Sequence, residues 1–222
     1  MLSTTSHTKS PKSPEFISPA IRNSLLMRQD GFGVYEGIVD DNTRNILLSE
    51  AVTLSLSAVA CNVPVSDREE VRGGKPARRF LNGSGGGLQE AFYQAPWLLK
   101  FLRGITHPSL VPTGSLGTYS YYARPGDYLA IHRDIVTCDV AVITCLSDVS
   151  EAPSDGGMLC LYPERLFEPL SVIRATSAQG AVKLRLKLGQ TIVMYGGIIP
   201  HALLPVAEGQ VRIVSVLCYR IP

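Results

Sequence analysis

The sequence predicts a mainly β domain with an N-terminal helical layer, of the jelly-roll or double-stranded β-helix class and cupin-like in architecture. Two observations lead to this fold class. From Thr113 onward, short runs of β-branched and aromatic residues lie between turn signals, and helical spacing disappears. Before that point, two segments carry loosely helical apolar spacing. About eight short strands that follow a helical layer are typical of a barrel with helices packed outside.

The expected elements are bounded by turns rich in Gly, Pro and Asp. Strands are expected at about 115–124, 128–133, 138–147, 157–162, 170–175, 181–187, 190–195 and 211–219, with a short strand in GVYEGIV at 33–39. Helices are expected at about 43–59, capped by Asp41 or Asn42, and at 88–102, where Pro96 interrupts the helix.

The domain organisation follows from composition along the chain. Residues 1–30 are rich in Ser, Thr, Pro and Lys, which predicts a flexible arm. Residues 31–222 form one domain, with helical support over about 41–105 and the barrel over about 113–222. The Gly-rich stretch 62–87 is expected to be a loop, and its GSGGG segment at 83–87 is a candidate lid.

Charge and cysteine content exclude several classes of protein. The 222 residues include 21 basic and 19 acidic ones, a balance too even for an electrostatic nucleic-acid binder. No apolar run approaches the roughly 20 residues needed to span a bilayer, and the first residues lack the apolar core of a secretory signal. Five cysteines without a CxxC pair argue against disulfides and structural zinc. We therefore expect a cytoplasmic protein with reduced, buried cysteines and without nucleic-acid or membrane partners.

The strongest chemical signal is His132-Arg133-Asp134 at the end of the run YLAIH. Alternate residues of an extended chain share a face, so His132 and Asp134 point one way and Arg133 points the other way. An imidazole and a carboxylate on one face supply two of the three ligands of a facial triad for non-haem Fe(II). His-x-Asp alone is common by chance, so the prediction needs a third ligand.

The expected third ligand is His201. Of the four histidines, His7 lies in the arm and His107 lies in a loop before a proline. Eleven residues beyond His201, Arg212 stands inside the apolar run VRIVSVLCYR. A buried arginine is costly without an anionic partner, and its guanidinium fork suits a carboxylate.

These residues belong to an ordered string of motifs. The string runs Tyr122…Pro125-Gly126-Asp127-Tyr128…His132-x-Asp134, then Gly156-Gly157-x-Leu159-x-Leu161-Tyr162, then Gly189…His201…Arg212. It resembles the Fe(II)- and 2-oxoglutarate-dependent dioxygenases, and within them the prolyl-4-hydroxylase-like branch. The resemblance covers about residues 31–222 and is most convincing over 115–222.

The resemblance implies that His132, Asp134 and His201 hold Fe(II). It also implies that Arg212 binds the distal carboxylate of the cosubstrate 2-oxoglutarate, with Tyr122 near the cosubstrate. O2 is then the second cosubstrate, and ascorbate is a candidate reductant for the iron.

The sequence departs from the family pattern at one strand. Cys145 stands where relatives often carry a cosubstrate-binding tyrosine, so Thr144 or one of the other tyrosines is a candidate replacement. Asp134 is retained, whereas the related halogenases have Gly or Ala at this position, which disfavours halogenation.

The predicted activity is hydroxylation of an unactivated C–H bond in a small, amino-acid-like or natural-product substrate, with release of succinate and CO2. A protein prolyl hydroxylase is the alternative, and a catalytically silent metal-binding barrel is a third. Lys75, Arg78 and Arg79 are candidates to meet a substrate carboxylate, although the sequence does not choose among them. The sequence leaves the oligomeric state open.

Overall fold

The computed structural model describes residues 17–64, 72, 75–149 and 156–222. Within this part of the chain, twelve antiparallel strands form one continuous sheet. The strands are β1 Phe32–Tyr35, β2 Val59–Val63, β3 Arg78–Ser84, β4 Val111–Pro112, β5 Thr118–Tyr122, β6 Tyr128–His132, β7 Val140–Val149, β8 Leu159–Leu161, β9 Val182–Leu184, β10 Thr191–Met194, β11 His201–Leu203 and β12 Val211–Arg220. The helices are α1 Pro19–Arg22, α2 Asp41–Leu54, α3 Gly87–Tyr93, α4 Pro96–Ile105 and α5 Leu170–Ala175, with short 3-10 turns η2 Met27–Gln29, η3 Ser55–Ser57 and η4 Pro163–Arg165.

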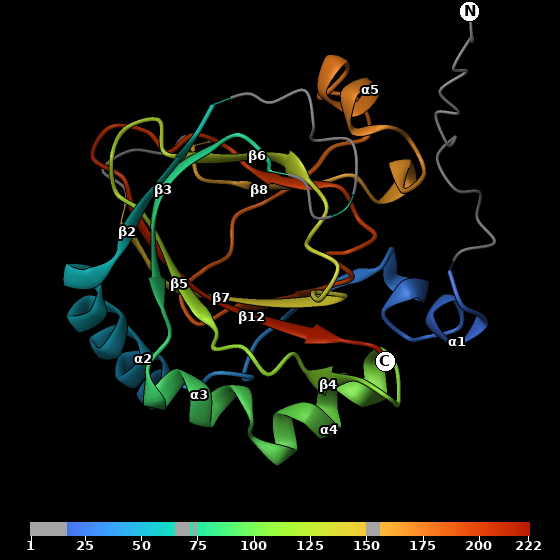
Figure 1. Ribbon diagram of the computed structural model, residues 1–222, viewed down its shortest axis with the longest axis horizontal. Helices are drawn as coiled ribbons and strands as arrows, with labels where there is room; N and C mark the ends of the chain where they lie inside the picture. The colour runs from blue at the N-terminus through green and yellow to red at the C-terminus, as the bar shows by residue number, and fades with distance from the viewer. Residues whose placement is uncertain (1–16, 65–71, 73–74, 150–155) are drawn as a thin grey trace, which may run out of the picture.

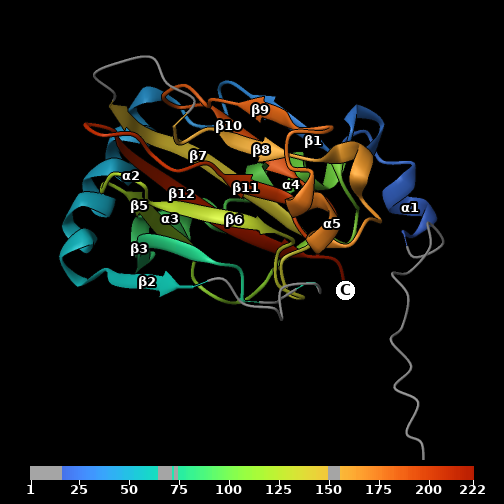
Figure 2. The same ribbon diagram turned by 90° about the horizontal axis from the view of Figure 1, so that it is seen from above.

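The sheet curls into two layers that face each other. Its strand order is β1-β10-β7-β12-β5-β3-β6-β11-β8-β9, with β2 attached to β3 and β4 attached to β12. One layer contains β7 and β12 and the other contains β6 and β8 (Figure 1). In the second layer β11 lies between β6 and β8 (Figure 2). The prediction of a mainly β jelly roll with an N-terminal helical layer is confirmed.

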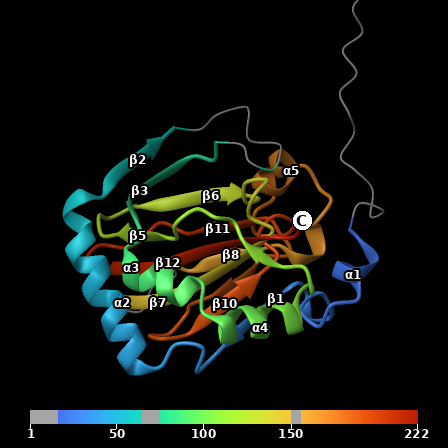
Figure 3. The same ribbon diagram turned by 60° about the horizontal axis from the view of Figure 1, so that its bottom comes forward.

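Helices α2, α3 and α4 cover the outer face of the β7–β12 layer (Figures 1 and 3). The Asp40 carboxylate caps α2 by accepting a hydrogen bond from the Thr43 backbone N–H at 2.7 Å. Leu47 and Ala51 of α2 are fully buried in a large apolar cluster that joins the helices to the sheet. None of the described helices combines the length and the apolar character that crossing a bilayer requires.

Several details of the secondary structure differ from the predictions, including the cap of the first long helix, which is Asp40 and not Asp41 or Asn42. Residues 170–175 form helix α5 instead of a strand, because the chain turns into a helix at Pro169 and buries Leu170 and Ile173 on one face. The first long helix ends at Leu54, and β2 begins five residues later. Strand β3 lies inside the predicted loop 62–87, and the three-residue strand β11 lies where no strand was predicted.

The GSGGG segment does not form a lid. Its first two residues end β3 and its last residue begins α3. The carboxylate of Glu50 on α2 accepts hydrogen bonds from the backbone N–H groups of Leu88 and Gln89, at 2.7 and 3.0 Å. A Cβ atom on Gly86 would lie 2.4 Å from Oε1 of Glu50, so the glycine permits this close approach. The segment therefore fastens α3 to α2.

Part of the predicted arm is packed against the domain. Leu26 is fully buried, and its backbone N–H donates to the Ile105 carbonyl at 2.8 Å. The Tyr195 hydroxyl donates to Oγ of Ser24 at 2.9 Å. Residues 17–30 are therefore part of the folded domain, whereas residues 1–16 of the predicted arm lie outside the described residues.

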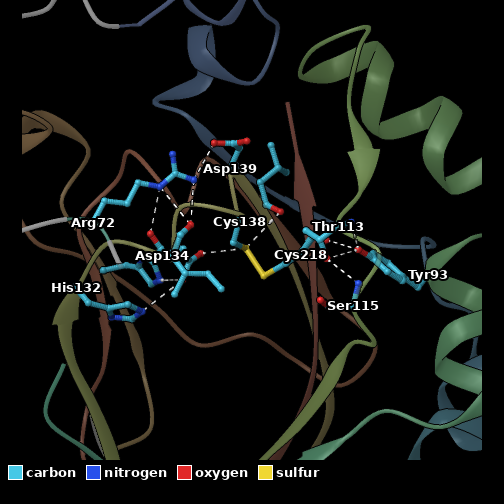
Figure 4. Close-up of a disulfide and its surroundings, with 12 residues drawn as sticks. Arg72, Tyr93, Thr113, Ser115, His132, Asp134, Cys138, Asp139 and Cys218 are labelled. Atoms are coloured by element: carbon cyan, nitrogen blue, oxygen red, sulfur yellow. Dashed lines mark hydrogen bonds and ion pairs between the residues drawn. A yellow bond between two sulfur atoms is a disulfide. The ribbon is translucent and has the colours of Figure 1, made fainter. Parts of the chain in front are cut away.

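A disulfide corrects the prediction for the cysteines. Cys138, in the loop after β6, is bonded to Cys218 near the end of β12, 80 residues further along the chain (Figure 4). Cys61, Cys145 and Cys160 are not part of a disulfide. The expectation of a reducing, cytoplasmic location rested in part on all five thiols being free, so the disulfide removes that part of its support.

Replacing Cys218 by Ser should destabilise the protein strongly. Closing a loop of 80 residues stabilises a fold by about 4 kcal/mol in the chain-entropy model, because the cross-link restricts the unfolded chain. Denaturant unfolding without reductant measures the difference, and Cys61→Ser at a free, half-buried cysteine is the control. Reduced wild-type protein should match Cys218→Ser. Equal stability of oxidised wild type and Cys218→Ser would contradict the disulfide.

Candidate metal and cosubstrate site

A cavity of about 420 Å³ lies between the two layers of the sheet. Its walls come mainly from β3, β5, β6, β11 and β12, together with the loop that follows β6. All but one of the predicted site residues line it, namely Tyr122, His132, Asp134, His201 and Arg212. Most of the remaining wall is apolar, which suits a site that excludes water.

The three predicted metal ligands converge in this cavity. His132 ends β6 and His201 begins β11, and these two residues are directly paired across the ladder. Nε2 of His132 lies 3.5 Å from Oδ1 of Asp134, and Nε2 of His201 lies 3.6 Å from the same oxygen. Two donor atoms that each lie about 2.1 Å from one metal are about 3.0 Å apart if the angle at the metal is about 90°. They are about 4.2 Å apart if that angle is about 180°. The three donor atoms therefore fit a single metal ion.

Hydrogen bonds fix the tautomer of both imidazoles. Nδ1 of His132 lies 2.9 Å from the Ala130 carbonyl, and Nδ1 of His201 lies 2.9 Å from the Ile199 carbonyl. A carbonyl only accepts, so each Nδ1 carries the proton. Each Nε2 points toward Asp134, and in the neutral ring it carries the lone pair that a metal would take, which is the arrangement of metal-ligating histidines.

The electrostatics of the cluster favour an ionised carboxylate. Burial works to raise the pKa of Asp134, but the neighbouring charge and hydrogen bonds of His201 and His132 outweigh it and hold this pKa below its ordinary value. Burial, together with His201, lowers the pKa of His132. Burial also acts to lower the pKa of His201, yet attraction to Asp134 leaves that pKa raised. A carboxylate and a neutral His132 are the forms that bind a divalent cation.

The loop after β6 holds Asp134 in place. The Asp134 backbone N–H donates to the Gly196 carbonyl at 2.8 Å. Nε of Arg72 donates to the Asp134 carbonyl at 3.2 Å, and its Nη2 donates to Oδ1 of Asp139 at 2.8 Å (Figure 4). Sγ of Cys138 lies 3.7 Å from Oδ2 of Asp134. The sequence analysis did not identify Arg72 or the disulfide as supports of this candidate ligand.

Arg212 is buried and held by an acidic partner that the sequence analysis missed. Nη1 of Arg212 donates to Oδ2 of Asp148 at 2.8 Å, and Nη1 of Arg185 donates to the same oxygen at 3.0 Å. Arg212 and Arg185 carry two positive charges and Asp148 carries one negative charge, so the three side chains together have a net positive charge. Nε of Arg212 is buried without a hydrogen-bond partner among the described residues, so the guanidinium retains donor capacity for an anion in the cavity.

Arg185 itself has two polar partners. The alternating Lys183, Arg185 and Lys187 predict a solvated strand face, but Arg185 turns inward to Asp148 and to the Gly156 carbonyl, at 3.0 and 2.6 Å.

Of the two remaining predicted residues, the structure places one at the cavity and one away from it. Tyr122 is the ladder partner of Arg212 and lines the cavity. Burial raises its pKa, which keeps the phenol neutral and able to donate. The prediction for Thr144 is not supported, because its hydroxyl lies 2.9 Å from that of Thr191 and it does not line the cavity. Ala141 and Ile143 line the cavity instead, and alternation along β7 turns Thr144 to the other face.

Comparisons with known proteins bear on the fold. No family model matches the sequence, and no curated protein matches it. Among solved structures, a Pseudomonas putida prolyl-4-hydroxylase superposes with a TM-score of 0.59 at 16% identity, over 89% of this chain and 96% of that chain. HygX from Streptomyces hygroscopicus, with nickel and 2-oxoglutarate bound, gives 0.63 at 14% identity over 89% and 86%. The chain has the fold of the 2-oxoglutarate-dependent dioxygenases.

Another protein with the dioxygenase fold is described as catalysing a different reaction, an epimerisation. The non-heme alpha ketoglutarate dependent epimerase SnoN, from nogalamycin biosynthesis, gives a TM-score of 0.63 at 15% identity, over 87% of this chain and 78% of that chain. The dioxygenase fold therefore leaves the reaction to the residues of each site.

Replacing Gly196 by Ala should weaken metal binding without removing a ligand. The new Cβ atom would lie 1.9 Å from Oδ2 of Asp134, so the carboxylate must move. Loss of such a support typically costs about 10- to 100-fold in metal affinity. Anaerobic calorimetry with Fe(II) measures the change. Gly104→Ala, where a Cβ atom meets nothing within 4 Å, is the control, and equal affinity in the two variants would contradict the assigned position of Asp134.

Proposed function

We propose that the protein is an Fe(II)- and 2-oxoglutarate-dependent dioxygenase that hydroxylates an unactivated C–H bond of a small, amino-acid-like or natural-product substrate. The observation that carries the proposal is one cavity with two features. Three metal-binding atoms from His132, Asp134 and His201 converge in it, and the buried Nε of Arg212 stands in its wall without a partner.

The residues present fit both groups that this reaction requires. Two imidazoles and one carboxylate on one side of a metal are typical of non-haem Fe(II) oxygenases, and they leave positions open for other ligands. The chemistry that bound iron and 2-oxoglutarate supply is oxidation by O2, which yields succinate, CO2 and a hydroxylated product, with ascorbate as an external reductant.

The chain itself positions the metal ligands and the cosubstrate, and it excludes water from the site. The carbonyls of Ala130 and Ile199 hold the two imidazole rings by their Nδ1–H groups. Arg212, fixed by Asp148, would orient the distal carboxylate of 2-oxoglutarate, and Tyr122 beside it offers a neutral donor. The apolar wall keeps water from the reacting C–H bond.

A protein prolyl hydroxylase is the second candidate. It is supported by the fold similarity to prolyl hydroxylases, one of which is described in complex with a peptide fragment. Ile135 and Val136, beside Asp134, are 55% and 70% exposed and would meet an apolar peptide. A silent barrel has no need of three convergent donor atoms, and this argues against the third candidate.

The test is an anaerobic titration of the protein with Fe(II) and 2-oxoglutarate. A weak visible charge-transfer band that needs both components is expected, and it should vanish in His201→Ala. Arg212→Gln should weaken 2-oxoglutarate binding about 10- to 100-fold, because a hydrogen bond to a charged group contributes about 1.5–3 kcal/mol.

Thr144→Val is the matched control and should leave the band unchanged, since Thr144 faces away from the cavity. Folded protein that binds the metal but gives no band would contradict the cosubstrate assignment. Succinate release with free amino acids, compared with prolyl peptides, then separates the two candidate substrate classes.

A further inference from the structure

Neighbouring arginines on β3 have different environments. Arg79 is engaged, since its Nε donates to Oδ1 of Asp127 at 3.3 Å and its Nη2 donates to the Pro125 carbonyl. Arg78 lines the cavity instead, and its buried Nε has no hydrogen-bond partner among the described residues. A buried donor without a partner carries a desolvation cost that a ligand acceptor would remove.

The other charged groups of the cavity wall are already engaged. Arg133 donates to the carbonyls of Ile198, Leu166 and Glu168, at 3.1, 2.7 and 2.9 Å. Arg212 is paired with Asp148, and Asp134 belongs to the metal cluster. Among the described lining residues, Arg78 is the charged side chain that the proposed iron and cosubstrate leave unused.

Arg78 is placed to contact a molecule that lies beside the cosubstrate. Its ladder partner on β6 is Leu129, three residues before His132. The next cavity-facing residue of β3 is Phe80, whose ring packs on Tyr122 with centroids 5.0 Å apart. Tyr122 is in turn the ladder partner of Arg212. The Phe80–Tyr122 ring pair thus comes between Arg78 and Arg212 in the sheet.

The surroundings of Arg78 suit a ligand with one anionic group and an apolar body. Pro76, Leu129 and Leu203 provide apolar wall on the same side of the cavity. Asn82 and Ser120 add neutral polar atoms further along β3 and β5, with the Ser120 hydroxyl 3.5 Å from Oδ1 of Asn82. A single guanidinium matches the charge and the planar shape of one carboxylate.

We propose that Arg78 binds a carboxylate of the main substrate, so that this substrate is a small carboxylic acid with an apolar body. The proposal rests on the function proposed above and names the substrate class of the same site. Arg78 is then a specificity-determining residue, and Arg212 remains the partner of the cosubstrate.

The test compares acids with their uncharged amides. The probes are N-acetyl-leucine, N-acetyl-proline and 4-methylpentanoate, each paired with its primary amide. Ligand-observed saturation-transfer NMR measures their affinities for protein loaded with Zn(II) and 2-oxoglutarate, which does not turn over. Wild type should bind at least one acid about tenfold or more tightly than its amide, because a charged hydrogen bond is lost in the amide.

Arg78→Gln should abolish this preference. Lys75→Gln is the matched control, because it removes the same charge from an exposed position three residues away that does not line the cavity. Wild-type protein without a preference in any pair would overturn the proposal, and so would a preference that survives Arg78→Gln. Since no hydrogen bond of the Arg78 side chain is found among the described residues, Arg78→Gln should also keep the wild-type unfolding midpoint, which guards against a folding artefact.

Two further readouts separate this proposal from the function on which it rests. The affinity for 2-oxoglutarate should be unchanged in Arg78→Gln, and a loss as large as that in Arg212→Gln would assign Arg78 to the cosubstrate and overturn the proposal. If wild type binds neither metal nor 2-oxoglutarate, the proposed function fails. An acid-over-amide preference that depends on Arg78 in the metal-free protein would still establish the carboxylate site.

Discussion

The pairing of β6 with β11 is the constraint on which the site depends. It places His132 opposite His201, 69 residues apart in sequence, with ring centroids 4.2 Å apart. Each ring is held by a carbonyl two residues earlier in its own chain segment, at Ala130 and Ile199. The positions of both nitrogen donors therefore follow from backbone geometry, and only the carboxylate of Asp134 must be delivered by a loop.

Several independent interactions hold that loop in place. Two are hydrogen bonds to the backbone of Asp134, and one is a disulfide to a distant strand. The backbone of Asp134 binds Gly196, Arg72 binds the carbonyl of Asp134, and the disulfide of Cys138 ties the end of the loop to β12. On the opposite layer, Asp148 similarly fixes Arg212. Preorganised donors of this kind need no rearrangement when a metal or an anion binds, and for that reason they favour tight and specific binding.

The sequence was sufficient to select the three candidate ligands that converge in the cavity and insufficient for the residues that support them. Period-two alternation and the small number of histidines select His132, Asp134 and His201, because both signals are local or compositional. Thr144 was chosen wrongly because β7 is buried on both faces, so sequence alone does not reveal which parity meets the cavity. Cys138 and Cys218 resemble ordinary apolar strand residues, and only the three-dimensional pairing of β7 with β12 brings them together. Arg78 lies on β3, within a segment whose Gly-rich composition predicts a loop and not a strand.

The proposed iron site can be tested with crystals grown anaerobically with Fe(II) and 2-oxoglutarate, by anomalous diffraction at the iron edge. We expect one iron peak bonded to Nε2 of His132, Nε2 of His201 and a carboxylate oxygen of Asp134, with the distal carboxylate of 2-oxoglutarate on Arg212. Iron bound elsewhere, or a cavity in which these three side chains hold no metal, would contradict it.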